Sequence, residues 1–254
     1  MSLRIPVATT ADLNTESVLD FLAWLKRRGL SPRTLKAKRT GILTLWKFAH
    51  TIGLVDQPPT GIPGLKMPRK IPRAWRKDEF ASLVATAEKH PQGDTLKALL
   101  LTLFDTGGRL GAVLNAKLED YDPRTGLLTT FESKTKTERV TMLGSATREA
   151  LAKLPKNRAK LIGPPTSSSR LRKHMKRLVA DAGLKPGTRV CFQGVRRLKY
   201  SLVYSQLGPA EAARHAGHMT QGMERFYYDP RVTPSADIAA LIPPPLESEP
   251  AAAG

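Results

Sequence analysis

Apolar residues near the start of the chain recur every three to four positions, which is the period of an amphipathic helix. The first such run predicts a helix over residues 15–28, with Asn14 as the capping residue at its start and Gly29 at its end. Its apolar positions are Val18, Phe21, Leu22 and Leu25. Because these positions share one face, we expect the helix to pack against a neighbour along that face.

A second helix is predicted to begin at Ser31-Pro32, a capping residue followed by proline, and to run to residue 52. The residues expected to face inward are Leu35, Ile42, Leu45, Trp46 and Ala49. The basic residues expected on its exposed faces are Arg33, Lys36, Lys38, Arg39 and Lys47. No acidic residue occurs among them, so contact with phosphate groups is favoured over a face that is merely solvated.

A proline-rich stretch follows these helices. Residues 56–73 contain five prolines and two glycines, and proline removes backbone donors, so this composition predicts a linker. We place a basic linker at residues 58–75, between a helical domain (10–57) and a larger domain (76–235), and expect the tail (236–254) to be largely disordered. The linker residues expected to contact phosphate groups are Lys66, Arg69, Lys70 and Arg73.

The larger domain combines helical periodicity with one β-rich segment. Two β-rich runs, 126–133 and 138–143, flank the sequence KTKT and predict a hairpin. Helices are expected over residues 77–90, 94–107, 109–122, 146–154, 168–184, 193–208, 209–218 and 220–229. The expected fold class is therefore mainly α with a small β-sheet.

Composition adds a strong charge preference. Lys and Arg number 41 against 22 Asp and Glu, which gives a formal net charge of +19 and a pI of about 10.3. The excess is spread over both predicted domains, so an extended surface for nucleic acid is favoured over an anionic membrane. The single cysteine, Cys191, excludes an internal disulfide framework, and no zinc-ligand spacing or bilayer-length apolar run is present. We expect no metal, no cofactor, no membrane and a cytoplasmic location.

Three basic positions could contact a phosphate group directly. Arg109 follows Gly107 and Gly108 at the predicted start of a helix, where the backbone can approach a phosphate closely. This segment matches neither a P-loop nor the dinucleotide-binding fingerprint, and alone it indicates only a surface or capping arginine. Lys134 lies in the predicted hairpin turn, and one of the adjacent Arg196 and Arg197 is expected to point inward.

Taken together, the segments resemble the tyrosine recombinases, the phage integrase family. The family motifs, in chain order, are TG-x-R-x-x-E-x-x-x-L, a hairpin Ser-Lys-Thr, His-x-x-Arg, and Leu-Gly-His followed nine residues later by Tyr. Here they read TGGRLGAVLNAKL, SKTKTER, QGVR and AGHMTQGMERFY. The N-terminal helices also resemble the family's core-binding domain, so the resemblance covers roughly residues 15–235.

The resemblance implies site-specific cleavage and rejoining of duplex DNA through a 3′-phosphotyrosyl bond. Arg109 and Arg196 would hold the non-bridging phosphate oxygens, Lys134 would protonate the leaving 5′ oxygen, and His218 would assist at the phosphate. Tyr227 would be the nucleophile, and the covalent bond would conserve the energy for rejoining without ATP or metal. The partners implied are DNA carrying recombination sites and further copies of the chain, up to a tetramer, at the nucleoid.

Three positions depart from the family pattern. Gln193 stands where the motif has its histidine, and Ala112 stands where it has glutamate. Tyr228, directly after Tyr227, is a second candidate nucleophile. Gln193 is retained in the predicted catalytic set, since its amide can donate a hydrogen bond to phosphate.

Other functions remain open at this point. A type IB topoisomerase would share the cleavage chemistry but act as a monomer, and a non-catalytic DNA-binding remnant would fit Gln193 and Ala112. A structural RNA-binding protein would explain the charge but not the ordered set of residues. The segment PSADIAALI (234–242) fits either a helix that docks on another protomer or one that folds back on its own domain.

Overall fold

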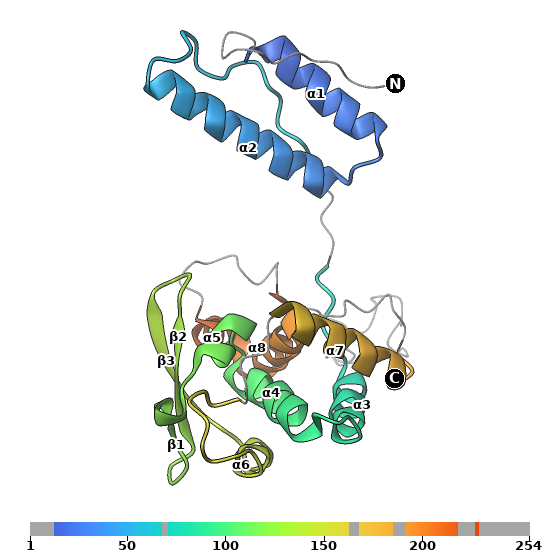
Figure 1. Cartoon of the computed structure of the whole chain (residues 1–254), viewed down its shortest axis with the longest axis vertical. Coiled ribbons are helices and arrows are strands. Elements are labelled where there is room, and N and C mark those ends of the chain that lie inside the picture. The colour runs from blue at the N-terminus through green and yellow to red at the C-terminus, as the bar shows by residue number, and fades with distance from the viewer. Residues whose placement is uncertain (1–12, 68–70, 163–167, 185–191, 218–226, 229–254) are drawn as a thin grey trace, which may run out of the picture. The chain divides into compact units, whose positions relative to one another are not determined.

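The protein consists of two compact units, residues Met1–Lys70 and Ile71–Gly254. It is mainly helical with one small antiparallel sheet, which confirms the predicted fold class. The computed structural model describes residues 13–67, 71–162, 168–184, 192–217 and 227–228 (Figure 1). Within these ranges, no helix combines the length and the apolar character that crossing a bilayer requires.

The N-terminal unit contains the two predicted helices, α1 (Thr15–Arg27) and α2 (Pro32–Thr51), lying side by side (Figure 1). Both predicted caps are present. The Asn14 side chain accepts a hydrogen bond from the backbone N of Ser17 at 3.0 Å, and Ser31 accepts one from Thr34 at 3.2 Å. These bonds satisfy donors that have no partner inside the helix, so local sequence alone sets where both helices begin.

The core of this unit is small. Val18, Trp46 and Ile62 are buried together, and the Trp46 indole donates to the carbonyl of Gln57 at 2.9 Å. The prediction that Leu45 faces inward is wrong, since 61% of its surface is exposed. A two-helix unit covers only one narrow side of α2, so the adjacent Leu45 lies beyond the covered stripe.

The ends of the predicted linker pack into the units beside them. Ile62 is buried in the N-terminal core, and Thr15 donates a hydrogen bond to the carbonyl of Thr60 at 3.0 Å. Ala74 and Trp75 are buried in the core of the second unit. Proline content therefore indicates a stretch without regular structure, but much of that stretch is held by packing.

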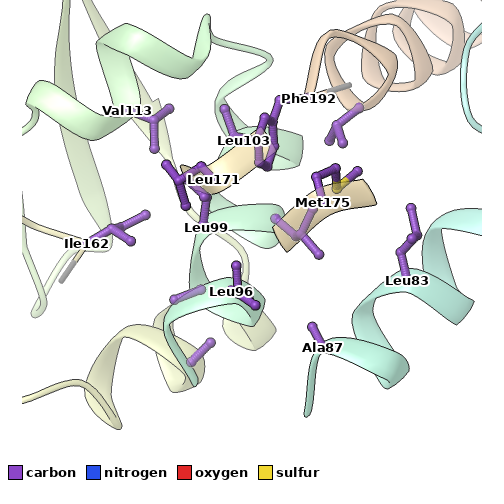
Figure 2. Packing of buried hydrophobic residues seen from close by; sticks show 14 of the residues in the cluster. Leu83, Ala87, Leu96, Leu99, Leu103, Val113, Ile162, Leu171, Met175 and Phe192 are labelled. Atoms are coloured by element: carbon purple, nitrogen blue, oxygen red, sulfur yellow. The ribbon is translucent and has the colours of Figure 1, made fainter. Parts of the chain in front are cut away.

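The second unit is built around helix α4 (Gly93–Thr106), which packs against helices on several sides and against the sheet. The other helices are α3 (Lys77–Glu88), α5 (Leu110–Asn115), α6 (Ser145–Ala152), α7 (Ser168–Asp181) and α8 (Phe192–Ala216). Figure 2 shows the apolar side chains that fill the space between them, among them Leu96, Leu99 and Met175. These three side chains are at most 2% exposed, so the unit has a continuous dry core.

The start of α8 fits tightly against the chain that enters this unit. Trp75 is fully buried and donates its backbone N–H to the carbonyl of Gly194 at 3.4 Å. A Cβ atom at Gly194 would lie 2.7 Å from the Trp75 indole nitrogen. Glycine is therefore required at this position by close approach, and the contact fixes the first turn of α8.

The sheet consists of β1 (Tyr121–Asp122), β2 (Leu127–Glu132) and β3 (Thr137–Met142) in that order, all antiparallel. The predicted hairpin is confirmed, and Glu132 pairs with Thr137 beside the KTKT turn. Leu128, Thr130 and Glu132 alternate along β2 on its buried face. A strand therefore delivers an acidic side chain into the interior at the end nearest the turn.

The predicted helix over residues 109–122 is wrong in its second half. Helix α5 ends at Asn115, because Ala116 adopts extended backbone angles, and a short 3-10 helix, η2 (Leu118–Asp120), follows. The Asp120 carboxylate accepts the Lys117 backbone N–H at 2.7 Å, which starts this new turn. Pairing of β1 with β2 then overrides the helical periodicity of this segment.

Helix α8 contains the predicted break. Gly208 has φ 85° and ψ 174°, which no helix allows, and Pro209 follows it, so two helical segments meet at a kink. The second segment ends at Ala216 and Gly217, the latter with φ 64°. The predicted tail (236–254), Cys191, His218 and most of the last predicted helix lie outside the described residues.

Candidate active site

The site centres on a buried carboxylate. Glu132, whose side chain is 4% exposed, accepts a hydrogen bond from Nη1 of Arg109 at 2.6 Å and one from the Arg109 backbone N at 3.2 Å. Its other close neighbours are Nη1 of Arg196 at 3.6 Å and Nη1 of Arg139 at 3.8 Å. Three arginines from different elements thus converge on one acid.

Arg109 is positioned by the turn between α4 and α5. Gly107 ends α4 with φ 54°, a left-handed conformation that glycine adopts without strain, and Arg109 then caps α5 in extended conformation. Thr106 stabilises the turn, since its hydroxyl accepts the Gly108 N–H at 3.1 Å and donates to the carbonyl of Thr102 at 2.7 Å. The glycine pair noted in the sequence therefore aims Arg109 at the site.

Arg196 is the inward member of the arginine pair on α8 and is 1% exposed. It donates to the carbonyls of Gly107 and Ala216, both at 2.8 Å, and so joins the end of α4 to both segments of the kinked helix. Arg197 is half-buried and donates to the carbonyl of Arg73 at 3.3 Å. Burial lowers the pKa of Arg196, and its interaction with Tyr227 acts in the opposite direction.

Arg139 and Glu132 were missed by sequence reasoning. Arg139, on β3, donates to the carbonyls of Thr106, at 2.9 Å, and of His215. Along β2 and β3, successive residues alternate between an inward and an outward side. Glu132 and Arg139 lie on the inward side, where a charged residue is unusual. The apolar alternation of the hairpin sequence points the other way, because Leu127, Phe131, Val140 and Met142 are exposed, so it could not have identified either residue.

The charges of the cluster shift one another. Burial alone would raise the pKa of Glu132, but the hydrogen bonds and charge of Arg109, with the charge of Arg196, outweigh it and hold the pKa below its usual range. Burial lowers the pKa of Arg139, and the positive charge of Arg196 adds to that effect. The carboxylate is therefore ionised at neutral pH and screens the arginines from one another.

The two adjacent tyrosines have different surroundings. The Tyr227 ring lies 5.1 Å from the Arg196 guanidinium and 5.7 Å from the Tyr200 ring, and it is 8% exposed. The Tyr228 ring instead stacks on Tyr204, with ring centroids 4.2 Å apart. Among the described contacts, only Tyr227 thus lies beside an arginine of the cluster.

His215 is a further residue that the sequence did not single out. Its ring lies beside Gly107, where a Cβ atom would come within 3.1 Å of Nε2. Burial, together with the charges of Lys199, Arg139 and other basic groups, lowers the pKa of His215 to about 4. The ring is therefore neutral at neutral pH, and among the described residues its Nε2 has no hydrogen-bond partner.

Two other predicted site residues lie on the hairpin and on α8, which also supply members of the cluster. Lys134 is exposed in the hairpin turn, and Gln193 is half-buried in the first turn of α8. His218 lies outside the described residues. Ala112, at the position where the family motif has glutamate, is buried in α5 and is 5% exposed.

The basic residues predicted to contact phosphate differ in their exposure. Arg39 is half-buried and donates to the carbonyl of Ile62 at 2.6 Å, so part of its donor set holds the N-terminal core together. Arg69 and Lys70 lie outside the described residues. The exposed members are Arg33, Lys36, Lys38, Lys47, Lys66 and Arg73.

Within the described residues, no three metal-ligating side chains come together.

The sequence of this chain is similar to a protein-family model and to curated proteins. The model of the phage integrase family matches residues 73–233. Tyrosine recombinase XerA of Thermococcus kodakarensis is 31% identical over 129 residues, 51% of this chain and 44% of that protein. Tyrosine recombinase XerC of Xanthomonas campestris pv. campestris is 28% identical over 142 residues, 56% of this chain and 44% of that protein. The chain thus spans about half the length of these curated relatives.

Solved structures share the fold at lower identity. A lambda integrase dimer bound to a COC' core site superposes with a TM-score of 0.73 and 21% identity, over 87% of this chain and 82% of that one. XerH site-specific recombinase, in a pre-cleavage complex with its difH substrate, gives a TM-score of 0.66 and 18% identity over 84% of this chain and 66% of that one. These similarities extend beyond the segment that the family model matches.

Proposed function

The chain belongs to the phage integrase family, and we propose that it is a site-specific DNA recombinase that cuts and rejoins strands through a 3′-phosphotyrosyl bond at Tyr227. The observation that carries the proposal is the position of Tyr227 beside Arg196, the most buried arginine of the cluster. A nucleophile and a fixed positive charge thus share one site. A guanidinium matches phosphate in both charge and geometry, so this pair is suited to a DNA phosphate.

The charge of the cluster suits a phosphoryl transition state. Arg109, Arg139 and Arg196 supply three positive charges, and Glu132 supplies one negative charge. Attack on a phosphodiester, which carries one negative charge, builds a second one on the equatorial oxygens. Because the arginines are already held by backbone carbonyls and by Glu132, they meet this charge without reorganising at the moment of reaction.

Strand cleavage exchanges one phosphate ester bond for another. The Tyr227 hydroxyl gives up its proton to solvent as its oxygen forms a bond to phosphorus. The bond from phosphorus to the 5′ oxygen breaks, and Lys134 gives that oxygen a proton. His218 and Gln193 are assigned to hydrogen bonds with the phosphate. The phosphotyrosyl ester keeps the energy of the broken bond, so a 5′-hydroxyl of either the same or another strand can reverse the step.

The proposed partner is duplex DNA that carries recombination sites. Supporting this, XerH and lambda integrase are each described in complex with DNA sites of their own. Related structures include a lambda integrase dimer and a tetramer on a Holliday junction, and we propose assemblies of up to four copies for this chain, formed on DNA at the nucleoid. The named curated relatives are recombinases, which weighs against the topoisomerase alternative.

Selection from a randomised duplex pool tests the proposal and identifies the target sequence in the same experiment. Bound duplexes are enriched over several rounds, sequenced, and rebuilt with a nick at successive positions, so that cleavage releases a short fragment and traps the protein. A recombinase yields paired inverted half-sites and a DNA adduct that survives denaturant. A protein that enriches a defined site but never forms the adduct is a non-catalytic binder, and adducts with random duplexes alone favour a topoisomerase.

A further inference from the structure

Glu132 is not part of the family motif, and the acidic residue of that motif is missing from this chain. The motif has glutamate three residues after its first arginine, and here that residue is the buried Ala112. Three arginine side chains nevertheless converge nearby, and their mutual repulsion in a water-poor site requires a counter-charge. Among the described residues, the only carboxylate within 4 Å of all three is that of Glu132.

We propose that Glu132 is the positioning residue of the cleavage site, which supplies from strand β2 the carboxylate that the motif places on the helix after Arg109. This inference rests on the proposed recombinase function. In this chain the acid lies on a strand, whereas the motif places it on the helix after the first arginine. Glu132 touches no reacting atom in this scheme and acts through the arginines.

The contacts with Arg109 show how the orientation is set. Oε2 of Glu132 accepts from the guanidinium at 2.6 Å, and Oε1 accepts from the backbone N of the same residue at 3.2 Å. This two-point hold fixes both ends of a long side chain that is still 28% exposed. One guanidinium N–H is used, so the planar group keeps further donors for a bidentate contact with phosphate.

The same carboxylate regulates how strongly the site attracts phosphate. Its Oε1 atom lies 3.6 Å from Arg196 and 3.8 Å from Arg139, so its negative charge weakens the field that both project. Removing this charge strengthens the attraction for phosphate in the ground state. It also releases Arg109 from the orientation that the transition state needs, so binding and cleavage should respond in opposite directions.

A purely structural role for Glu132 predicts a different outcome. If the carboxylate only neutralised buried charge, its removal would loosen the hairpin and the start of α5, and DNA binding, cleavage and thermal stability would fall together. Opposite changes in affinity and cleavage rate distinguish positioning from support of the fold.

Glu132→Gln removes the charge and keeps the shape, and Glu138→Gln is the matched control. Glu138 lies on β3 of the same hairpin, is exposed, and is one strand position from the partner of Glu132, so each variant removes one negative charge from the same hairpin. Affinity for the selected duplex is measured by fluorescence anisotropy in a Tyr227→Phe background. The cleavage rate is measured on the nicked duplex at saturating protein, well below the unfolding temperature of each variant.

For Glu132→Gln we expect cleavage slower by roughly 10- to 100-fold, the scale expected when orientation is lost, with DNA affinity higher by at least about threefold. Glu138→Gln should leave the cleavage rate within about twofold, a difference too small to mark a lost contact. Glu132→Asp, which keeps the charge on a shorter stem, should recover part of the rate. Parallel losses of affinity, rate and stability in Glu132→Gln, or cleavage equal to that of Glu138→Gln, would overturn the proposal.

Returning the acid to its motif position provides a second test. Glu132→Ala combined with Ala112→Glu restores a carboxylate one helical turn from Arg109 and should cleave faster than Glu132→Ala alone. If the unmodified protein forms no adduct, the recombinase function fails by itself, and the affinities still decide the role of Glu132. In that case tighter binding by Glu132→Gln than by Glu138→Gln supports the charge relationship, and equal binding refutes it.

Discussion

The guanidinium of Arg196 lies 5.1 Å from the centre of the Tyr227 ring, while the neighbouring Tyr228 stacks on Tyr204 instead. Adjacent residues usually differ in direction, and here the difference separates two candidate nucleophiles by their environment. Tyr227 approaches positive charge fixed by backbone carbonyls, whereas Tyr228 takes part in an aromatic pair. This contrast supports the proposal that Tyr227, and not Tyr228, is the nucleophile.

The assignment predicts that Tyr227→Phe binds the selected duplex with unchanged affinity and forms no denaturant-resistant adduct, because the attacking oxygen is absent. Tyr228→Phe removes the same atom one residue later and should still form the adduct, since the stacked ring is retained. Gel electrophoresis under denaturing conditions detects the labelled adduct. Mapping the labelled peptide to Tyr228 in the unmodified protein would reverse the assignment.

Arg196→Lys is expected to slow cleavage by about 10²–10³-fold, the range seen when one fixed donor to a developing oxyanion is lost. Lysine keeps the charge but cannot reach the carbonyls of Gly107 and Ala216 with a planar fork, so conservation of charge alone should not rescue the rate. Single-turnover cleavage at saturating protein measures the effect. Arg197→Lys is the control, since that side chain lies outside the cluster, and an equal loss there contradicts the assignment.

The lowered pKa of His215 predicts how the stability of the fold depends on pH. Its pKa of about 4 in the folded protein lies below that of an unfolded histidine, so protonation favours unfolding. The free energy that the neutral His215 ring contributes to folding is fully present above pH 6.5, the pKa of an unfolded histidine. It is lost as the pH falls from there to about 4. We expect the free energy of unfolding to fall by about 1–2 kcal/mol over this range, after a reduction for partial solvent screening.

His215→Gln removes the titrating group with little change in volume and should flatten the decline of melting temperature between pH 6.5 and about 4. His50→Gln is the matched control, because that ring lies exposed in the N-terminal unit and bonds to the carbonyl of Val55. Thermal unfolding followed by circular dichroism at several pH values provides the measurement. A decline equally steep in His215→Gln and the unmodified protein rules out this linkage.

Gly194→Ala should destabilise the second unit by about 1–3 kcal/mol, the usual cost of overpacking. The new Cβ atom would lie 2.7 Å from the Trp75 indole nitrogen, and that ring is fully buried in the core. Gly111→Ala is the control, because no atom lies within 4 Å of its Cβ position in α5. That variant should be neutral or slightly stabilising, and melting temperatures compare the two.

Local sequence signals predict the elements of this fold, and tertiary contacts decide where some of them end. Asn14 and Ser31 cap helices as predicted, because capping depends on atoms within three residues. The helix expected to continue through residue 122 stops at Asn115, because pairing with β2 competes for the following backbone. Leu45 is exposed for a similar reason, since burial depends on a neighbour that the pattern cannot supply.

The same distinction applies to the site. Arg109 and Arg196 are predictable from motif order, which carries their spacing along the chain. Arg139 and Glu132 matter because two strands bring them to that pair, and their significance depends on register. Only after the hairpin is taken as a sheet with one buried face does a charged residue on that face stand out.

Gln193 is the clearest departure from the family motif, and the variant Gln193→Ala tests its role. A glutamine amide donates a hydrogen bond to phosphate but cannot exchange a proton near neutral pH as histidine can. One neutral hydrogen bond contributes about 0.5–1.5 kcal/mol, so we expect cleavage slower by roughly tenfold, far less than for Arg196→Lys. The rate is measured on a nicked duplex at saturating protein, so that weaker binding is not mistaken for slower chemistry.

Gln193→His distinguishes the two roles that this position can have. If the residue only positions phosphate, histidine and glutamine serve equally, and the rate should stay within about twofold of the unmodified protein. A gain approaching 10²-fold, typical of a general acid or base, would contradict positioning and show that the natural chain lacks a proton-transfer group. Gln193 is half-buried in the first turn of α8, three residues before Arg196, so glutamine or histidine at this position lies one helical turn from that arginine.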